Sequence, residues 1–353
     1  MGAMLVALAA APALDAQQTG LERLPRDVLD AAPPSAHVRG GPGAMAVQPQ
    51  ACRTLPTGQT RRRIVEVAVQ EWGFFGFRSV DQTDVVGGPA LGDDGVRAGG
   101  TVRDARRARW RPRIAPEEGA RVAASIAGYW AVTPEGSWIV ERQNEAWNGP
   151  DGTAARWNAP WSAAFVSWVM CEGGLRSSDR FQRAIAHHTY IDQAIRARDQ
   201  AASRAAFVAH NAGEAAVAPG DLLCTSRRPV YNTIEERRRQ MGAGARTHCD
   251  IVVKVDVAAA RILAIGGNVR GTVGLKILPA VSSGGALRLP GRSQIRGARP
   301  VFAHLKLRAA PGDGNAFDTS PTIKALSCAG PSATLARRAA SSIVTAAALR
   351  CAD

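Results

Sequence analysis

The spacing of apolar residues in the first half of the chain predicts helices. Over residues 62–75 they recur every three or four positions, as on one face of a helix. A second helix is expected over 116–130, because it opens with proline and two acidic residues. A compact apolar helix is expected over 160–171, stopped by Gly173-Gly174, and another over about 179–209. Residues 81–108 and 143–160 are interpreted as loops.

The second half of the chain alternates apolar and polar residues, which predicts strands. A short strand, Leu222-Leu223-Cys224, follows a turn at 219–221. Residues 248–268 predict a hairpin, and further strands are expected around 272–278 and 300–307. Helices followed by strands indicate an α+β domain rather than a strand-helix-strand repeat.

Four segments divide the chain. Residues 1–16 contain a short apolar run with an A-x-A-like end and resemble a signal peptide, although no basic residue precedes the run. Residues 17–60 are rich in Pro, Gly, Ala and Gln and predict an irregular N-terminal arm. Residues 61–308 form the α+β domain. Residues 309–353 are expected to be a loop and an Ala-rich helix over 332–349.

The predicted hairpin brings two polar side chains together. If it turns about Ala258, residue 252 faces 264, 250 faces 266, and His248 faces Asn268 at about 5 Å. An amide oxygen beside a histidine can fix its tautomer and leave the other ring nitrogen to act as a base. The alternative is an ordinary strand histidine and a turn asparagine. Gly266 and Gly267 would let another element approach closely.

The opposite face of this hairpin is apolar and is predicted to face the core. It collects Cys249, Ile251, Val253 and Val255 against Leu263 and Ile265.

Ser162 lies in the first turn of the helix predicted over 160–171. A helix N-terminus stabilises a developing anion through its dipole and its free N–H groups, so this position suits a nucleophile. The alternative is a capping serine, which is a common role at helix starts.

Four motifs, in this order, resemble the CHAP and NlpC-like amidases. PWSAAFVSWVMCEGG is similar to their WCAAFVSW-type helix with Ser162 in place of cysteine, PGDLLC to their PGD strand, HCDIVV to their histidine strand, and AIGGNV to their GGN segment. The resemblance covers about residues 60–308 and extends to an uncharacterised bacterial domain family related to these amidases. It implies a papain-like α+β fold with helices packed on an antiparallel sheet or partial barrel.

The resemblance also implies roles. Ser162 is at the nucleophile position, His248 is the base, Asn268 orients it, and N–H groups near Ser162 form an oxyanion hole. The reaction implied is cleavage of amide bonds in peptidoglycan stem peptides. A serine hydroxyl, unlike a thiol, must be deprotonated during attack by an aligned base. A working serine hydrolase, a silent binder of wall fragments and a module with another role therefore remain open.

Several further residues are candidates for contacts with substrate. Trp147, Trp157 and Trp161 could stack on sugar or peptide, with core packing as the alternative. His187, His188 and Tyr190 could line a cleft, with packing or surface exposure as the alternative. Asp250 shares the predicted face of His248 and could tune its pKa, with an exposed strand acid as the alternative.

The charge of the chain limits which classes of partner are expected. The net charge of +14 suits polyanions, although a bias toward Arg codons also explains it. Peptidoglycan or another cell-envelope polymer is favoured over nucleic acid, because no basic face interleaved with aromatic residues occurs. An anionic-surface binder driven by charge alone is the remaining alternative. The signal-peptide-like run within residues 1–16 predicts an exported, periplasmic or extracellular protein. No other stretch reaches transmembrane length. The sequence does not define an oligomeric state.

The six cysteines permit disulfides in an exported protein. Cys224 and Cys249 are predicted to pair if their strands are neighbours, and Cys328 is predicted to pair with Cys351. A zinc site is not expected, because no C-x-x-C pair exists. Neither a metal nor an organic cofactor is implied.

Overall fold

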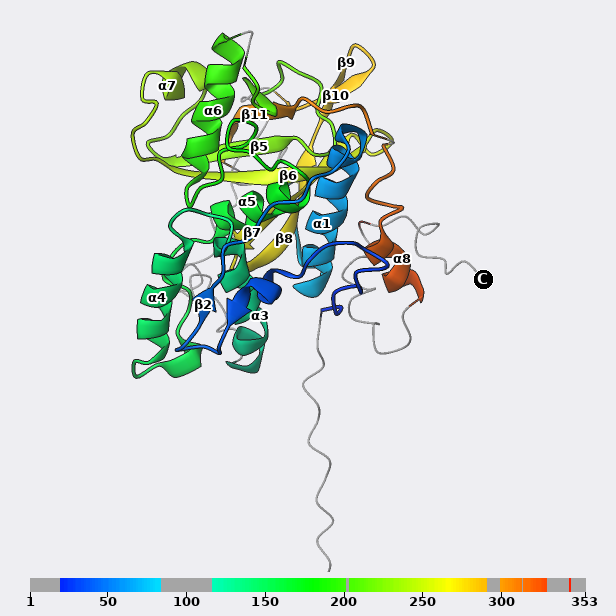
Figure 1. Ribbon diagram of the computed structural model, residues 1–353. Coiled ribbons are helices and arrows are strands. Elements are labelled where there is room, and N and C mark those ends of the chain that lie inside the picture. The colour runs from blue at the N-terminus through cyan, green and yellow to red at the C-terminus, as the bar shows by residue number, and fades with distance from the viewer. Residues whose placement is uncertain are drawn as a thin grey trace, which may run out of the picture.

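The computed structural model describes residues 20–83, 116–200, 203–290, 299–312, 314–328 and 343. These residues form a mixed α+β structure built around a seven-stranded sheet (Figure 1). The described α-helices are α1 (Thr60–Phe74), α3 (Pro116–Trp130), α4 (Gly136–Trp147), α5 (Ser162–Glu172), α6 (His187–Asp199), α7 (Ile234–Arg238) and α8 (Pro321–Cys328).

The large sheet has the strand order β3-β8-β7-β6-β5-β11-β4. All neighbours in it are antiparallel except β3, which is parallel to β8. Among the described residues β3 and β4 stay at opposite edges, so the sheet is open and no barrel is closed. The strands are β3 (Ser79–Asp81), β4 (Phe207–His210), β5 (Leu222–Arg228), β6 (Arg246–Asp256), β7 (Arg261–Val269), β8 (Thr272–Pro279) and β11 (Val301–Leu307).

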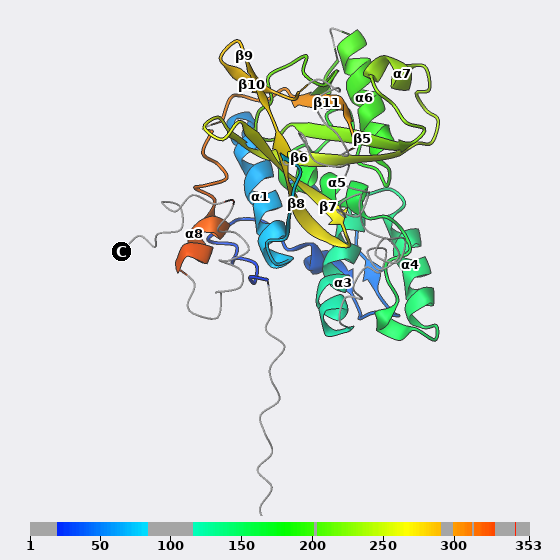
Figure 2. The same ribbon diagram turned by 180° about the vertical axis from the view of Figure 1, so that it is seen from behind.

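Two-stranded ribbons accompany the large sheet. One is formed by β1 (Val38–Arg39) and β2 (Ala46–Val47), the other by β9 (Val281–Ser283) and β10 (Ala286–Arg288). The latter extends beyond the large sheet in both views (Figures 1 and 2).

Helices α1 and α5 pack on the central strands of the sheet, and α6 packs mainly on its edge strand β4. The main core lies between these layers and contains Ile64, Phe165, Ile191, Ile251 and Ile265 among its fully buried side chains. A smaller apolar cluster covers the other face of the sheet, with Leu223, Val252 and Ala264 at its centre. Because α5 is buried along its whole length, its first residue is held rigidly against the sheet.

The β6–β7 hairpin follows the predicted register only in the pairs that lie farther from its turn. Val252 pairs with Ala264 as predicted, but Lys254 pairs with Leu263 because a bulge at 253 adds one residue to β6. The prediction for Val255 was therefore wrong. The shift pairs it with Ile262 and turns it toward the smaller apolar cluster, whereas Cys249, Ile251, Val253, Leu263 and Ile265 all join the main core.

The N-terminal arm is largely irregular between its short 3₁₀ turns, η1 (Pro34–His37) and η2 (Thr57–Gln59), and it runs along α3 and α4. Arg23 anchors it through two hydrogen bonds of 2.6 and 2.7 Å to the buried Glu71 of α1. A disulfide joins Cys52 of the arm to Cys171 near the end of α5. No helix among the described residues is both long and apolar enough to cross a membrane.

Several element boundaries differ from the prediction. The helix expected over 179–209 is confined to α6, because Phe207 and Ala209 alternate inward on β4 and pair with β11. Helix α4 extends to Trp147, inside the segment expected to be a loop, and α8 lies in the segment expected to begin with a loop. The predicted helix 332–349, apart from residue 343, and most of the predicted loop 81–108 lie outside the described residues.

Candidate functional site

Ser162 is the first residue of α5, and its side chain does not cap that helix. The N-cap residue is Trp161, which makes no side-chain capping bond. Instead, the Ser162 hydroxyl lies 2.7 Å from Nε2 of His187. Ser162 is 8% exposed and His187 is 3% exposed, so this contact is shielded from water.

His187 begins α6 and is held on both ring nitrogens. Its Nδ1 contacts the Tyr190 hydroxyl one helical turn further along. Burial lowers the pKa of His187 well below its usual value of 6.5, and the nearby His248 lowers it further. Burial likewise raises the pKa of Tyr190 well above 10. The imidazole and the phenol are therefore both neutral at pH 7, and a neutral imidazole can accept the serine proton.

A second histidine, His248, lies beside His187 and contacts a carboxylate. Nε2 of His248 on β6 is 2.9 Å from Oδ1 of Asp250, and Nζ of Lys276 on β8 is 2.7 Å from the other carboxylate oxygen. Burial acts to raise the pKa of Asp250, but Lys276 and His248 outweigh it and lower that pKa. Burial also lowers the pKa of His248. Asp250 is therefore a carboxylate that orients a largely neutral histidine.

The two histidines come from different elements and meet edge to face. Their ring centroids are 5.3 Å apart with an interplanar angle of 62°. The site thus combines the start of α5, the start of α6 and the outer end of β6. Asp250 adds a negative charge that raises the pKa of His187 against the larger effect of burial, so an imidazolium formed there would be stabilised.

The glycines of the GGN segment make this meeting sterically feasible. A Cβ at Gly266 would lie 2.1 Å from Asp250 Oδ1 and 3.0 Å from His248 Nε2. A Cβ at Gly267 would lie 2.5 Å from the Cβ of Phe165 on α5. The close approach predicted for this segment is therefore present, and it brings β7 against both the carboxylate and the helix that carries Ser162.

Asn268 does not make the predicted contact with His248. It has a φ of 56°, and the pairing of β6 with β7 ends at Ile251–Ile265. His248 instead pairs with Thr225 on β5. Among the described residues no hydrogen bond joins His248 to Asn268, and Nε2 of His248 contacts Asp250 instead.

The residues expected to contact substrate are distributed differently. Trp161 is 2% exposed and lies between Phe75 and Tyr129 in the core, which is the packing alternative. Trp157 is half-buried and packs edge to face on Trp147. His188 is also half-buried, with Nδ1 3.2 Å from the carbonyl of Ala245.

The sequence alone did not single out His187 as the partner of Ser162. Positions 187 and 190 are three residues apart, which places them on one face of a helix. That spacing could have indicated the His187–Tyr190 pair. The contact with Ser162 could not have been found in this way, because it depends on how α6 packs beside α5.

Two disulfides support the elements of the site. Cys224 and Cys249 are directly opposite on β5 and β6 and are joined by a disulfide, next to His248. The Cys52–Cys171 bond, which was not predicted, fixes the far end of α5. Cys328 is also disulfide-bonded, and Cys351, its predicted partner, lies outside the described residues.

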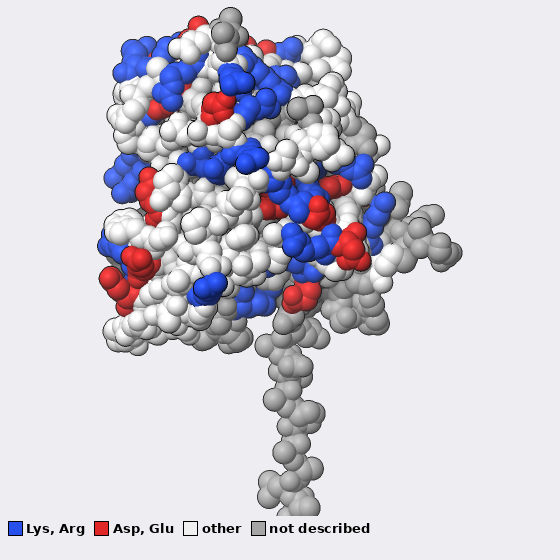
Figure 3. All heavy atoms as spheres, viewed as in Figure 1, with Lys and Arg blue, Asp and Glu red and all other residues white. Residues whose placement is uncertain are grey.

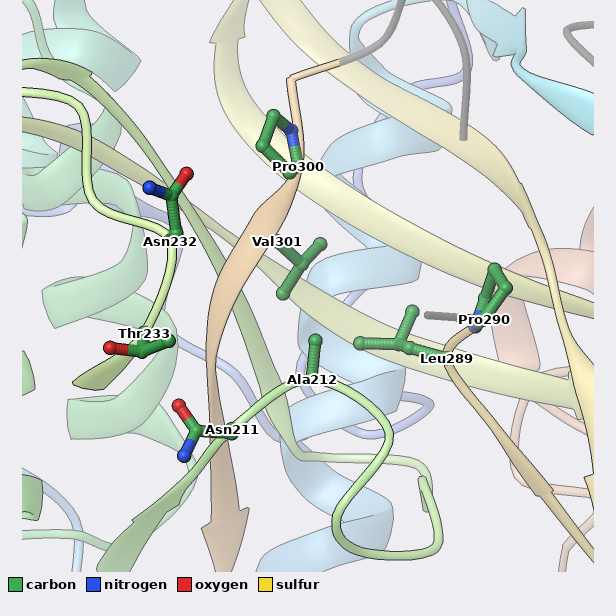
Figure 4. Close-up of a pocket in the computed structure, with 8 residues that line it drawn as sticks. All are labelled: Asn211, Ala212, Asn232, Thr233, Leu289, Pro290, Pro300 and Val301. Atoms are coloured by element: carbon green, nitrogen blue, oxygen red, sulfur yellow. The ribbon is translucent and has the colours of Figure 1, made fainter. Parts of the chain in front are cut away.

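A pocket of about 140 Å³ opens elsewhere on the molecule. Figure 4 shows Asn211, Asn232 and Thr233 on one side of it and Leu289 and Pro290 on the other. None of the candidate residues lines it. The candidate site is therefore defined by its hydrogen bonds and not by this pocket. The described residues contain no cluster of three or more potential metal ligands.

Comparison with known protein families gives one match. Residues 118–307, more than half of the chain, match the model of a family described as uncharacterized proteins conserved in bacteria (DUF2272). The chain belongs to the DUF2272 family. The match runs from α3 to the end of β11, so the DUF2272 region contains the whole candidate site. No curated protein and no solved structure matches the chain.

Proposed function

We propose that this chain is an exported hydrolase-like protein of the cell envelope that cleaves an amide bond with Ser162 as nucleophile. The observation that carries the proposal is the 2.7 Å contact between the Ser162 hydroxyl and Nε2 of His187 at the start of α5. Nucleophile and base within hydrogen-bonding distance, with a third group holding the base, is the arrangement that acyl transfer needs.

In the proposed reaction each residue has a defined task. His187 takes the proton of Ser162 on Nε2, while its Nδ1–H donates to the oxygen of Tyr190. The negative charge of Asp250, which also orients His248, stabilises the resulting imidazolium. Asp250 thus takes the place that the sequence assigned to Asn268.

The start of α5 would stabilise the oxyanion. The first helical hydrogen bond is donated by Phe165 to the carbonyl of Trp161 at 3.0 Å. The N–H groups of Ser162, Ala163 and Ala164 precede it and have no partner within the helix. Donors of this kind, aimed at a developing negative charge, are the usual source of oxyanion stabilisation.

The proposal also includes a substrate and an evolutionary relationship to known amidases. The order of motifs supports a relationship to the papain-like CHAP and NlpC amidases, with a helix that carries the nucleophile packed on a strand that carries a histidine. Peptidoglycan stem peptides are the substrate that this relationship implies. The disulfides Cys52–Cys171 and Cys224–Cys249 support export, because such bonds persist in oxidising compartments.

A catalytically silent binder of wall fragments is the second candidate. It is favoured by the burial of Ser162 and His187 and by the strongly lowered pKa of His187, which makes this histidine a weak base. Nδ1 of His187 also contacts a phenol rather than a carboxylate. Under this hypothesis the same residues form the floor of a binding cleft and no bond is broken.

Digestion of purified peptidoglycan separates the two candidates. Wild type, Ser162→Ala and the control Ser178→Ala, which alters an exposed serine outside the site, are compared for release of soluble fragments and for sedimentation with peptidoglycan. A hydrolase releases fragments in wild type and Ser178→Ala but not in Ser162→Ala. Sedimentation of all three without release indicates the silent binder. Neither release nor sedimentation contradicts both.

A further inference from the structure

Two exposed arginines face each other at the end of the β5–β6 strand pair from which the connection through α7 leaves. Arg228 on β5 is directly paired with Arg246 on β6, after a bulge between residues 226 and 228. Directly opposite residues of an antiparallel pair have their side chains on one face, about 5 Å apart. Like charges in such a pair repel each other and destabilise the sheet. The arrangement is therefore costly unless an anion lies between them.

Within the described part of the chain, no acidic side chain neutralises this pair. Neither Arg228 nor Arg246 forms an ion pair or a side-chain hydrogen bond with a carboxylate there. Two arginines of nearby α7 are neutralised. Arg237 binds Asp192 through two bonds of 2.7 Å, and Arg238 binds Asp199 at 2.8 and 3.0 Å. Arg228 and Arg246 have no such carboxylate among the described residues.

The arginine pair continues the face of the candidate site. Arg246, His248 and Asp250 alternate along β6 and share one face of the strand. Exposure rises along this row, from the buried Asp250 through the half-buried His248 to the exposed Arg246. Two residues along a strand span about 6.6 Å. The arginines therefore lie one step outward from the histidine.

Charged groups around the site indicate the direction from which an anion would approach His248. Burial lowers the pKa of His248 most, Asp250 acts to raise it, and Lys276 and Arg299 act to lower it, so two cations lie near that histidine besides its carboxylate partner. Figure 3 shows basic side chains gathered at the end of the molecule that carries α6 and α7, and a broad uncharged area near the middle of the same face. An anion that approached the site from the α6–α7 end would be attracted before it reached His248.

We infer that Arg228 and Arg246 form an anion subsite that binds a carboxylate of the peptide whose amide bond lies at Ser162. This inference rests on the proposed function and names its substrate class, a peptide with a free carboxylate near the scissile bond. Guanidinium groups bind carboxylates through two parallel hydrogen bonds, which fixes orientation as well as charge. The subsite would hold the peptide across His248 with its amide directed toward the start of α5.

Binding to the inactive variant Ser162→Ala tests the subsite separately from catalysis. Acetyl-D-alanyl-D-alanine and its C-terminal amide are titrated calorimetrically at low salt, in this background and with Arg246→Gln or Arg228→Gln added. The expected result is that the free acid binds at least about tenfold more tightly than the amide, and that either arginine change removes this preference. Arg196→Gln, which removes an exposed arginine on α6, should leave it intact.

Equal binding of acid and amide, or a preference that survives both arginine changes, would overturn the subsite. Competition by inorganic phosphate gives a further check, because phosphate should displace the acid from an anion subsite but should not displace the amide. Equal displacement of both ligands would also overturn the subsite. The proposed function fails separately, if wild type releases no fragments from peptidoglycan.

Discussion

At the scale of single residues, the site depends on two histidines in different surroundings. His187 is enclosed by Ser162 and Tyr190, whereas His248 is partly exposed and is backed by Asp250. Burial lowers both pKa values, so both rings are neutral at pH 7. Only a neutral imidazole can accept the serine proton, so the same burial that weakens His187 as a base also keeps it in the form that can act.

These lowered pKa values predict a pH dependence of folding stability. Below the unfolded pKa of about 6.5 the unfolded chain binds protons that folded His187 does not, so stability falls as pH falls. The slope contributed by one such histidine approaches about 1.4 kcal/mol per pH unit. Urea unfolding at pH 7.5 and 5.5 should show a smaller loss for His187→Gln than for wild type. An equal loss in the two proteins would contradict the assignment.

Gly266 gives a prediction about the geometry of Asp250. Its absent side chain leaves the space that Asp250 Oδ1 and His248 Nε2 occupy. Gly266→Ala should displace the carboxylate, cost about 1–3 kcal/mol of stability and shift the imidazole ¹⁵N resonances of His248. Gly244→Ala, at a position with open space around it, is the matched control. Unchanged His248 resonances in Gly266→Ala would mean that the carboxylate does not hold this ring.

At the scale of elements, the decisive contact is between α5 and the β6–β7 hairpin. The alternating pattern of β6 and β7 correctly predicted the hairpin and most of its apolar face. The bulge at 253 could not be predicted, because Val253 is an ordinary strand residue and nothing in its local sequence favours a bulge. The bulge reverses the face of Val255 but leaves the Val252–Ala264 and Ile251–Ile265 pairs in the predicted register.

The location of Ser162 at a helix start was also predictable from the proline and the apolar run that surround it. Its true partner was not, because His187 reaches Ser162 only through the packing of α6 beside α5. Asp250, and not Asn268, contacts His248 for a similar reason. Asn268 leaves strand geometry at a positive φ, while Asp250 fills the space above Gly266.

The packing of α5 on β7 predicts a specific sensitivity at Gly267. A methyl group there would lie 2.5 Å from the Cβ of Phe165, which is fully buried and cannot move freely. Gly267→Ala should therefore push α5 from the sheet and lower the unfolding free energy by about 1–3 kcal/mol. Chemical denaturation measures this loss. If Gly267→Ala were as stable as wild type, the close approach of helix and strand would be wrong.

At the scale of the whole molecule, the Cys52–Cys171 and Cys224–Cys249 disulfides support the site over very different chain lengths. Cys52–Cys171 ties the N-terminal arm to α5 across 119 residues, and Cys224–Cys249 joins neighbouring strands across 25 residues. Together with the Arg23–Glu71 ion pair, the first bond makes the arm part of the folded domain. Removal of the arm would therefore expose core helices.

The different loop lengths predict different costs of removing the two bonds. Loop-closure entropy makes the longer loop more stabilising by about 1.4 kcal/mol. The double variant Cys52→Ser/Cys171→Ser should therefore lose more unfolding free energy than Cys224→Ser/Cys249→Ser, as measured by guanidinium denaturation under non-reducing conditions. A smaller loss for the Cys52/Cys171 variant would indicate that the arm is not held to α5 by this bond.

The central claim is that Ser162 is a nucleophile activated by His187. Labelling with a fluorophosphonate probe, followed by peptide mass spectrometry, tests it most directly. The account predicts that Ser162 is labelled in wild type and in Asn268→Ala, and that labelling is lost in His187→Ala. Absence of label on Ser162 in the folded wild-type protein, or undiminished labelling in His187→Ala, would contradict it.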